Sequence, residues 1–159
     1  MTMEREAGSH PASLSPLVSL SMDERQAKIT TTFERDPYAR AQGFTLGEIT
    51  ETTLTVSMTV RDDQVNFLGG THGGVVFSVA DCAFSLASNA YPQDAVAIDT
   101  HLAITAGSRI GDTLTATATE VARGKSLATY RVDVVRTDGR TVGAFTGSVF
   151  IQQTKPDSR

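Results

Sequence analysis

A glycine-rich turn runs directly into an apolar segment that carries one carboxylate, a combination typical of an active site. The turn contains Gly73, and the carboxylate is Asp81, eight residues further on. Unpaired amides in the first turn of a helix, together with the positive end of its dipole, stabilise an oxygen that gains negative charge. A carboxylate can act as nucleophile or general base. Both residues are therefore candidate catalytic residues.

The apolar segment is predicted to form one long helix over residues 74–90. Apolar residues recur there at helical spacing, so the helix is expected to be buried against a larger element. Polar residues three or four positions apart share one face of it: Ser78, Asp81, Ser85 and Ser88. The alternative is the solvated side of an amphipathic helix, although such a side usually carries Lys, Glu or Arg.

The separation of Gly73 and Asp81 predicts that two copies of the chain share each site. Eight residues of helix rise about 12 Å, so a carbonyl held on the Gly73 amide is out of reach of Asp81 in the same chain. The active unit is expected to be at least a symmetric homodimer. Asn66, in the turn, could donate its side-chain amide to the same carbonyl, or could bond the loop backbone instead.

The residues of this stretch strongly resemble the hotdog-fold acyl-CoA thioesterases of the phenylacetate-pathway (PaaI-type) branch. The matching positions are Asn66, Gly69, His72-Gly73-Gly74 and Ala80-Asp81, and the resemblance covers about residues 38–152. It implies an α+β hotdog fold, in which a curved antiparallel β-sheet wraps around one long central helix. It also implies an acyl-CoA thioesterase with no cofactor, since coenzyme A is part of the substrate.

The resemblance also implies roles for individual residues. Gly73 and Asn66 would hold the thioester carbonyl, and Asp81 of the partner subunit would be nucleophile or general base. His72 would orient the turn. Relatives often have a serine where this chain has Ala97, so Ser85 is expected to supply the hydroxyl that orients water. The alternative is that Ser85 bonds back to the helix backbone.

The expected substrate is phenylacetyl-CoA, hydroxyphenylacetyl-CoA or a medium-chain acyl-CoA. Substrate contacts are expected from apolar helix residues and basic loop residues: Gly74, Phe77, Phe84, Arg123 and Lys125. The basic residues, with Arg109, could meet the phosphates of coenzyme A, although surface solubility explains them equally. Relatives pair dimers into tetramers, and a homotetramer is a further expectation.

Two other functions are compatible with the same residues. One is a hotdog hydratase or dehydratase acting on an acyl thioester, which needs a histidine near a carboxylate. The other is a non-catalytic acyl-CoA-binding sensor, against which the intact Asp81 counts. His101, predicted to share a strand face with Asp99 and Ala97, could line a channel or interface, but a solvated face is the preferred interpretation. No metal site is expected, since these residues lack compact ligand spacing.

The rest of the sequence predicts strands around the central helix. Alternating or apolar runs, separated by turn residues, occur at 43–49, 54–60, 95–105, 113–121, 127–137 and 141–152. We expect a hairpin before the helix and a four-strand meander after it. A short amphipathic helix is expected over 22–36, ending before Pro37.

Length and composition indicate one domain with no nucleic-acid partner. The chain has 159 residues and a net charge of −4, without a basic cluster. We expect a disordered extension over 1–20, which includes His10, a hotdog domain over 21–153 and a mobile tail over 154–159. No signal peptide or transmembrane stretch is seen, and the lone Cys82 fits a reducing compartment, so a cytoplasmic location is expected.

Overall fold

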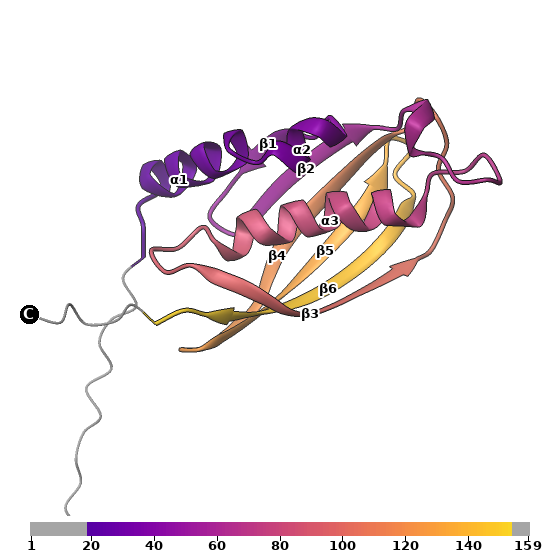
Figure 1. The fold of residues 1–159 in the computed structure, drawn as a ribbon. Coiled ribbons are helices and arrows are strands. Elements are labelled where there is room, and N and C mark those ends of the chain that lie inside the picture. Colours follow the sequence, from indigo (N-terminus) through magenta and orange to yellow (C-terminus); the bar gives the residue numbers. More distant parts are fainter. Residues whose placement is uncertain (1–18, 154–159) are drawn as a thin grey trace, which may run out of the picture.

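A six-stranded antiparallel sheet curves around one helix in the structure of this chain, a computed structural model that describes residues 19–153 (Figure 1). This is the arrangement that the resemblance predicted. Apart from residues 19 and 20, the extension expected over 1–20 lies outside the described residues, as does the tail expected over 154–159.

The helices begin and end at residues suited to those positions. They are α1 (Met22–Glu34), α2 (Pro37–Gln42) and α3 (Gly73–Ser88), with a short 3₁₀ turn η1 (Asp62–Gln64). Ser21 and Glu24 form a capping box at the start of α1. Sequence reasoning did not predict α2, which Asp36 caps and in which Pro37 takes the first position. Helix α2 places Tyr38 against α3, where its hydroxyl contacts Ser78.

The strands match the predicted runs closely, but their order does not follow the chain. They are β1 (Thr45–Ile49), β2 (Thr53–Thr59), β3 (Ala95–Ile104), β4 (Thr113–Arg123), β5 (Leu127–Arg136) and β6 (Thr141–Ile151). The sheet order is β1-β2-β4-β5-β6-β3. The expectation of a four-strand meander is therefore wrong, because β3 crosses to the far edge and pairs with β6. Alternation shows that a strand has a buried face, but not which neighbour it pairs with.

The core lies between α3 and the inner face of the sheet. Alternate residues of β2, β4, β5 and β6 point inward and are buried. Phe84 of α3 packs on Tyr130 and Phe145, with ring centroids 5.8 and 5.4 Å apart. Small residues allow the close approach: a Cβ at Gly147 would lie 2.8 Å from the Phe84 ring.

A β-bulge in β3 changes which residues share a face. Ala97 pairs with Val149, whereas Asp99 pairs with Ser148, so Ile98 is the extra residue. Val149 is buried, and Ala97 therefore lies on the side of the sheet that faces the helix. Asp99 and the exposed His101 lie on the other side. The prediction that Ala97 shares their face is wrong, because the bulge shifts the alternation by one residue.

Candidate active site

Asn66 organises the turn that precedes α3. Its backbone N–H donates to Gly70 C=O at 2.8 Å, and its C=O accepts from Gly69 at 2.9 Å. Its side-chain Oδ1 accepts from the amides of Leu68 at 2.9 Å and Gly70 at 3.3 Å. The side-chain oxygen is thus used to hold the turn, while Nδ2 donates to no group in the part of the chain that the structure describes.

His72 caps the first turn of α3 and leaves one amide unpaired. Its Nδ1 accepts from the Gly74 amide at 2.9 Å, and its own amide donates to Gln64 C=O at 2.9 Å. Gly74 is therefore not free to bind a substrate oxygen through its N–H. The Gly73 amide has no acceptor among residues 19–153. A Cβ at Gly73 would lie 2.9 Å from Ile104 Cδ1, so a larger residue would displace the Ile104 side chain.

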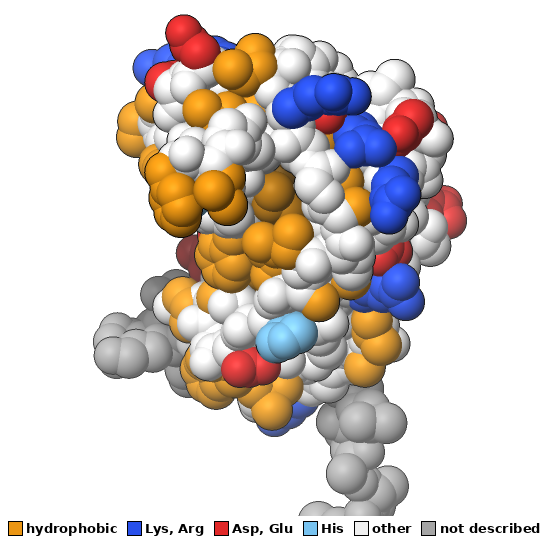
Figure 2. All heavy atoms as spheres, turned by 90° about the vertical axis from the view of Figure 1, so that its right-hand side faces the viewer, with side chains coloured by type: hydrophobic (Ala, Val, Ile, Leu, Met, Phe, Trp, Pro, Cys, Tyr) orange, Lys and Arg blue, Asp and Glu red, His pale blue; other side chains and the backbone are white. Residues whose placement is uncertain are grey.

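Asn66 and Gly73 line the same pocket, with a volume of about 450 Å³. Its other walls come from the first turn of α3, the end of β3 and the loop that follows: Gly70, Thr71, Val76, Ile104, Thr105, Ala106, Gly107 and Ser108. Figure 2 views the molecule from the right-hand side of Figure 1 and shows apolar side chains gathered across its middle, with Lys and Arg side chains along one side. Because Asn66 and Gly73 both line this pocket, the structure brings the two predicted carbonyl-binding donors together.

Asp81 lies outside this pocket. Gly73, Phe77, Asp81 and Ser85 form one row at four-residue intervals along α3. Burial raises the pKa of the Asp81 carboxyl above its ordinary value. It has no hydrogen-bond or ion-pair partner among the described residues.

Ser85 is exposed, and its hydroxyl makes no hydrogen bond within residues 19–153. The alternative in which it bonds back to the helix backbone is therefore not seen. Ser78 and Ser88 behave differently, since their hydroxyls donate to Gly74 C=O at 2.7 Å and Ser85 C=O at 3.1 Å. Of the three serines on this face, Ser85 alone has an unbonded hydroxyl in the described structure.

The two phenylalanines expected to line the pocket lie in different environments. Phe77 is half-buried against Phe145, with ring centroids 5.7 Å apart, and follows Gly73 by one turn. Phe84 has no exposed surface. The expected contact between Phe84 and substrate is therefore not available in this chain, because its ring fills the core.

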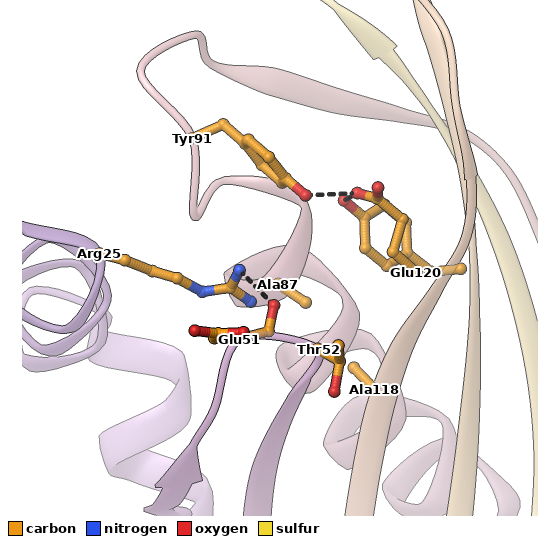
Figure 3. Close-up of a pocket in the computed structure, with 8 residues that line it drawn as sticks. Arg25, Glu51, Thr52, Ala87, Tyr91, Ala118 and Glu120 are labelled. Carbon is orange, nitrogen blue, oxygen red and sulfur yellow. Dashed lines mark hydrogen bonds between the residues drawn. The ribbon is translucent and has the colours of Figure 1, made fainter. Parts of the chain in front are cut away.

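A second pocket, of about 190 Å³, lies at the C-terminal end of α3. Figure 3 shows it between α1, the β1–β2 turn and β4. Glu120 lies on its wall, and Glu120 Oε2 accepts from Tyr130 at 2.5 Å, Tyr91 at 2.9 Å and Arg123 at 2.9 Å. Burial alone would raise the pKa of Glu120, but these three bonds hold it below its ordinary value.

Arg123 belongs to this cluster and not to a loop. It ends β4, its side chain is only 10% exposed, and it lies 3.5 Å from the centre of the Tyr91 ring. The expectation that Arg123 lies in a loop is wrong, and its guanidinium is already bonded to Glu120 and Tyr130. Glu120 and Arg123 are close in sequence, within β4, but no spacing in the sequence indicates that Tyr91 and Tyr130 join them, since these come from other parts of the chain.

The other basic residues lie at opposite ends of the sheet. Lys125 is exposed in the β4–β5 turn. The backbone of this turn bonds to Ile151 at the end of β6, and Ile151 pairs with Ala95 at the start of β3. Ile104 is nine residues away along β3, about 30 Å of strand. Lys125 is thus remote from the Gly73 pocket of its own chain. Arg109 directly follows Ser108, a residue of that pocket's wall.

Cys82 is buried beside Asp81 and is not a reactive thiol. Burial, with smaller contributions from Asp36 and Asp81, raises its pKa to about 12. Within residues 19–153, no three His, Cys, Asp or Glu side chains gather as metal ligands would. None of the helices described is both long and apolar enough to cross a membrane.

Comparison with known proteins gives a consistent result. Residues 68–143 match the family described as Thioesterase superfamily. The chain is 36% identical over 115 residues to acyl-coenzyme A thioesterase PaaI of Escherichia coli, covering 72% of this chain and 82% of that protein. It is 39% identical over 113 residues to a putative esterase of Deinococcus radiodurans, covering 70% and 77%. The solved structure of E. coli PaaI, from the phenylacetic acid degradation operon, superposes with a TM-score of 0.80 at 30% identity, covering 84% of this chain and 97% of that one.

Proposed function

Because this chain belongs to the thioesterase superfamily, as a hotdog-fold thioester hydrolase of the PaaI type, we propose that it hydrolyses acyl-CoA at sites shared between two copies. The observation that carries this proposal is the pair of unpaired donors, Gly73 N–H and Asn66 Nδ2, on one pocket. A carboxylate with no partner lies about 12 Å further along the same helix. A two-fold axis near Phe77, midway between them, would bring each carboxylate to the other chain's donors.

The two donors would stabilise the charge that develops on the thioester oxygen. Gly73 and Asn66 hold the carbonyl oxygen, and the oxygen gains negative charge as the carbon becomes tetrahedral. When Asp81 of the partner subunit acts as general base, it takes a proton from water, and the water oxygen bonds to the acyl carbon. The carbon–sulfur bond then breaks, and the thiolate of coenzyme A takes the proton from Asp81. The raised pKa of Asp81 makes its carboxylate a better base.

In the second route the Asp81 carboxylate attacks the acyl carbon itself. Coenzyme A leaves as the thiolate, and water then hydrolyses the resulting anhydride. Both routes use the same donors and the same carboxylate. A single turnover in ¹⁸O-water can identify the nucleophilic route: water that attacks Cγ of the anhydride places the label in Asp81, whereas the general-base route places it only in the released acid.

Strand β3 offers the surface on which a second copy would sit. It is an edge strand, paired only with β6 in the described sheet, and it exposes Val96, Ile98 and Ile104 by 46%, 57% and 56%. Exposed apolar edge strands pair readily with another chain. Ile104 also lines the pocket of Gly73, so a partner on this edge would lie beside the site. Two such dimers could form a tetramer in turn.

The name of the E. coli relative supports acyl-CoA as substrate, and its operon supports phenylacetyl-type acyl groups. Arg109, beside the pocket wall, is the basic residue best placed to meet a phosphate of coenzyme A. The hydratase alternative is weakened by His72, because its Nδ1 is used to cap α3.

Release of free thiol from a panel of acyl-CoAs tests the activity, and mixed dimers test the shared site. Asn66→Asp keeps the oxygen that holds the turn but removes the amide donor, and Asp81→Ala removes the carboxylate. Each variant alone should be nearly inactive. Mixed in equal amounts, they should regain about a quarter of wild-type turnover, because half of the dimers are mixed and one of their two sites is intact. No recovery, with subunit exchange demonstrated, would show that each site lies within one chain.

A further inference from the structure

Tyr38 places an exposed aromatic ring beside the face of α3 that carries Asp81. It lies in α2, and 54% of its surface is exposed. Its hydroxyl oxygen lies 2.7 Å from Ser78 Oγ. Ser78 precedes Asp81 by three residues, a spacing that puts the two Cβ atoms about 5–6 Å apart. The ring is therefore a neighbour of the candidate catalytic carboxylate.

The hydrogen bonds around Ser78 determine what the Tyr38 hydroxyl can still do. Ser78 donates its single hydroxyl hydrogen to Gly74 C=O at 2.7 Å. In the contact with Ser78, Tyr38 must therefore be the donor. Its phenolic oxygen keeps its acceptor capacity, and no donor reaches it from the rest of the described chain. An edge-on contact with Phe44, at 6.5 Å between ring centroids, fixes the ring.

We propose that Tyr38 is a specificity-determining residue of the thioesterase site. Its ring would pack against an aromatic acyl group, and its oxygen would accept a hydrogen bond from a hydroxyl on that group. This inference depends on the proposed function, since it assigns a substrate preference to the same site. Tyr38 lies outside residues 68–143, the part that matches the superfamily.

Three CoA esters and two variants test the proposal. We would measure kcat/KM for 4-hydroxyphenylacetyl-CoA, phenylacetyl-CoA and hexanoyl-CoA. Tyr38→Phe removes the acceptor alone, so it should lower kcat/KM for the hydroxylated ester about fivefold or more and leave phenylacetyl-CoA within about twofold. Tyr38→Leu removes the ring as well, and should lower both aryl esters several-fold relative to hexanoyl-CoA.

Two further variants guard against indirect effects. Tyr91→Phe makes the same chemical change at the other end of α3, where the hydroxyl donates to Glu120, and should leave the ratio of the two aryl esters unchanged. Ser78→Ala keeps Tyr38 but removes the acceptor that fixes the direction of its hydroxyl, so the phenolic oxygen is less well oriented and the preference for the hydroxylated ester should also fall. This variant keeps the test open if Tyr38→Phe fails to fold.

The possible failures are distinguishable. An unchanged ratio of the two aryl esters in Tyr38→Phe and Ser78→Ala would overturn the role of Tyr38, while the thioesterase function would stand. If the wild type hydrolysed hexanoyl-CoA but neither aryl ester, the role of Tyr38 would likewise be overturned. Release of thiol from none of the three esters would count against the proposed function itself.

Discussion

Around Glu120, at the C-terminal end of α3, the polar side chains bond to one another, and Arg25 Nε is the one buried polar side-chain atom without a partner among the described residues. At the N-terminal end of α3, two donors that line a pocket have no partner in the described chain. Glu120 accepts three hydrogen bonds at the first end. The Gly73 amide and Asn66 Nδ2 face a pocket at the other end, and Asp81 lies unpaired and half-buried between the two. Both regions are rich in polar groups, so polarity alone does not distinguish a site from a structural cluster.

The difference shows which region can bind a ligand. A satisfied buried network rigidifies the fold and has little left to offer a substrate. A donor that lines a pocket and has no partner can instead bond to a ligand. Titratable groups perturbed by burial also concentrate at functional sites. We therefore expect the N-terminal end of α3 to be the active end and the Glu120 cluster to have a structural role.

Replacing Asp81 should produce the largest effect. Asp81→Asn keeps the shape of the side chain and removes its capacity to attack or to take a proton. We expect turnover of acyl-CoA to fall by about 10²–10⁴-fold with the fold unchanged. Steady-state thiol release and circular dichroism measure the two properties. A folded variant that kept more than a tenth of wild-type turnover would remove Asp81 from the mechanism.

The same variant should be more stable than the wild type at neutral pH. Because burial raises the pKa of Asp81, the folded chain binds a proton more tightly than the unfolded chain. Stability therefore falls as the pH rises from the ordinary carboxyl pKa through the folded one. The advantage of Asp81→Asn in free energy of unfolding should shrink as the pH is lowered through that window. Urea unfolding at several pH values measures it, and an advantage independent of pH would exclude this cause.

Arg123→Met should instead lower stability and leave the chemistry intact. The methionine keeps the apolar stem but leaves the Glu120 carboxylate without its charged partner. Breaking a buried pair costs about 3–5 kcal/mol, and because Glu120 is 27% exposed we expect about 2–4 kcal/mol here. Lys125→Met, an exposed control two residues away, should change stability by less than about 0.5 kcal/mol.

Turnover per folded molecule should change little in either variant. A rise in KM for acyl-CoA in Arg123→Met without loss of stability would instead place Arg123 in the substrate site. That result would reverse the contrast between the two ends of α3.

The fold and the site were predictable to the extent that they are local in sequence. Asn66, Gly73 and Asp81 lie within one short stretch, so their types and spacing show in the sequence itself. Strand alternation and the apolar helix are equally local signals. The bounds of all six strands accordingly lie within two residues of the predicted runs.

What could not be predicted depends on contacts between distant segments. The position of β3 beside β6 is a matter of tertiary pairing, and the bulge at Ile98 has no marker residue. Tyr91 and Tyr130 reach Glu120 of β4 from other segments of the chain. The contact between Tyr38 and Ser78 spans 40 residues of sequence. Periodicity within a segment carries no information about such meetings.

Ser85→Ala should have the smallest effect and sharpens the comparison within one helix face. Ser85 follows Asp81 by one turn, and its hydroxyl has no partner in residues 19–153. Ala97, which stands where relatives often have a serine, has no hydroxyl to offer. If Ser85 orients the attacking water, the variant should lose about fivefold in kcat, the equivalent of one hydrogen bond, with KM nearly unchanged. Ser88→Ala is the matched control, because the buried Ser88 hydroxyl donates to Ser85 C=O; it should reduce stability and not kcat. Equal kcat in Ser85→Ala and wild type would leave the water to Asp81 alone or to a group of the partner subunit.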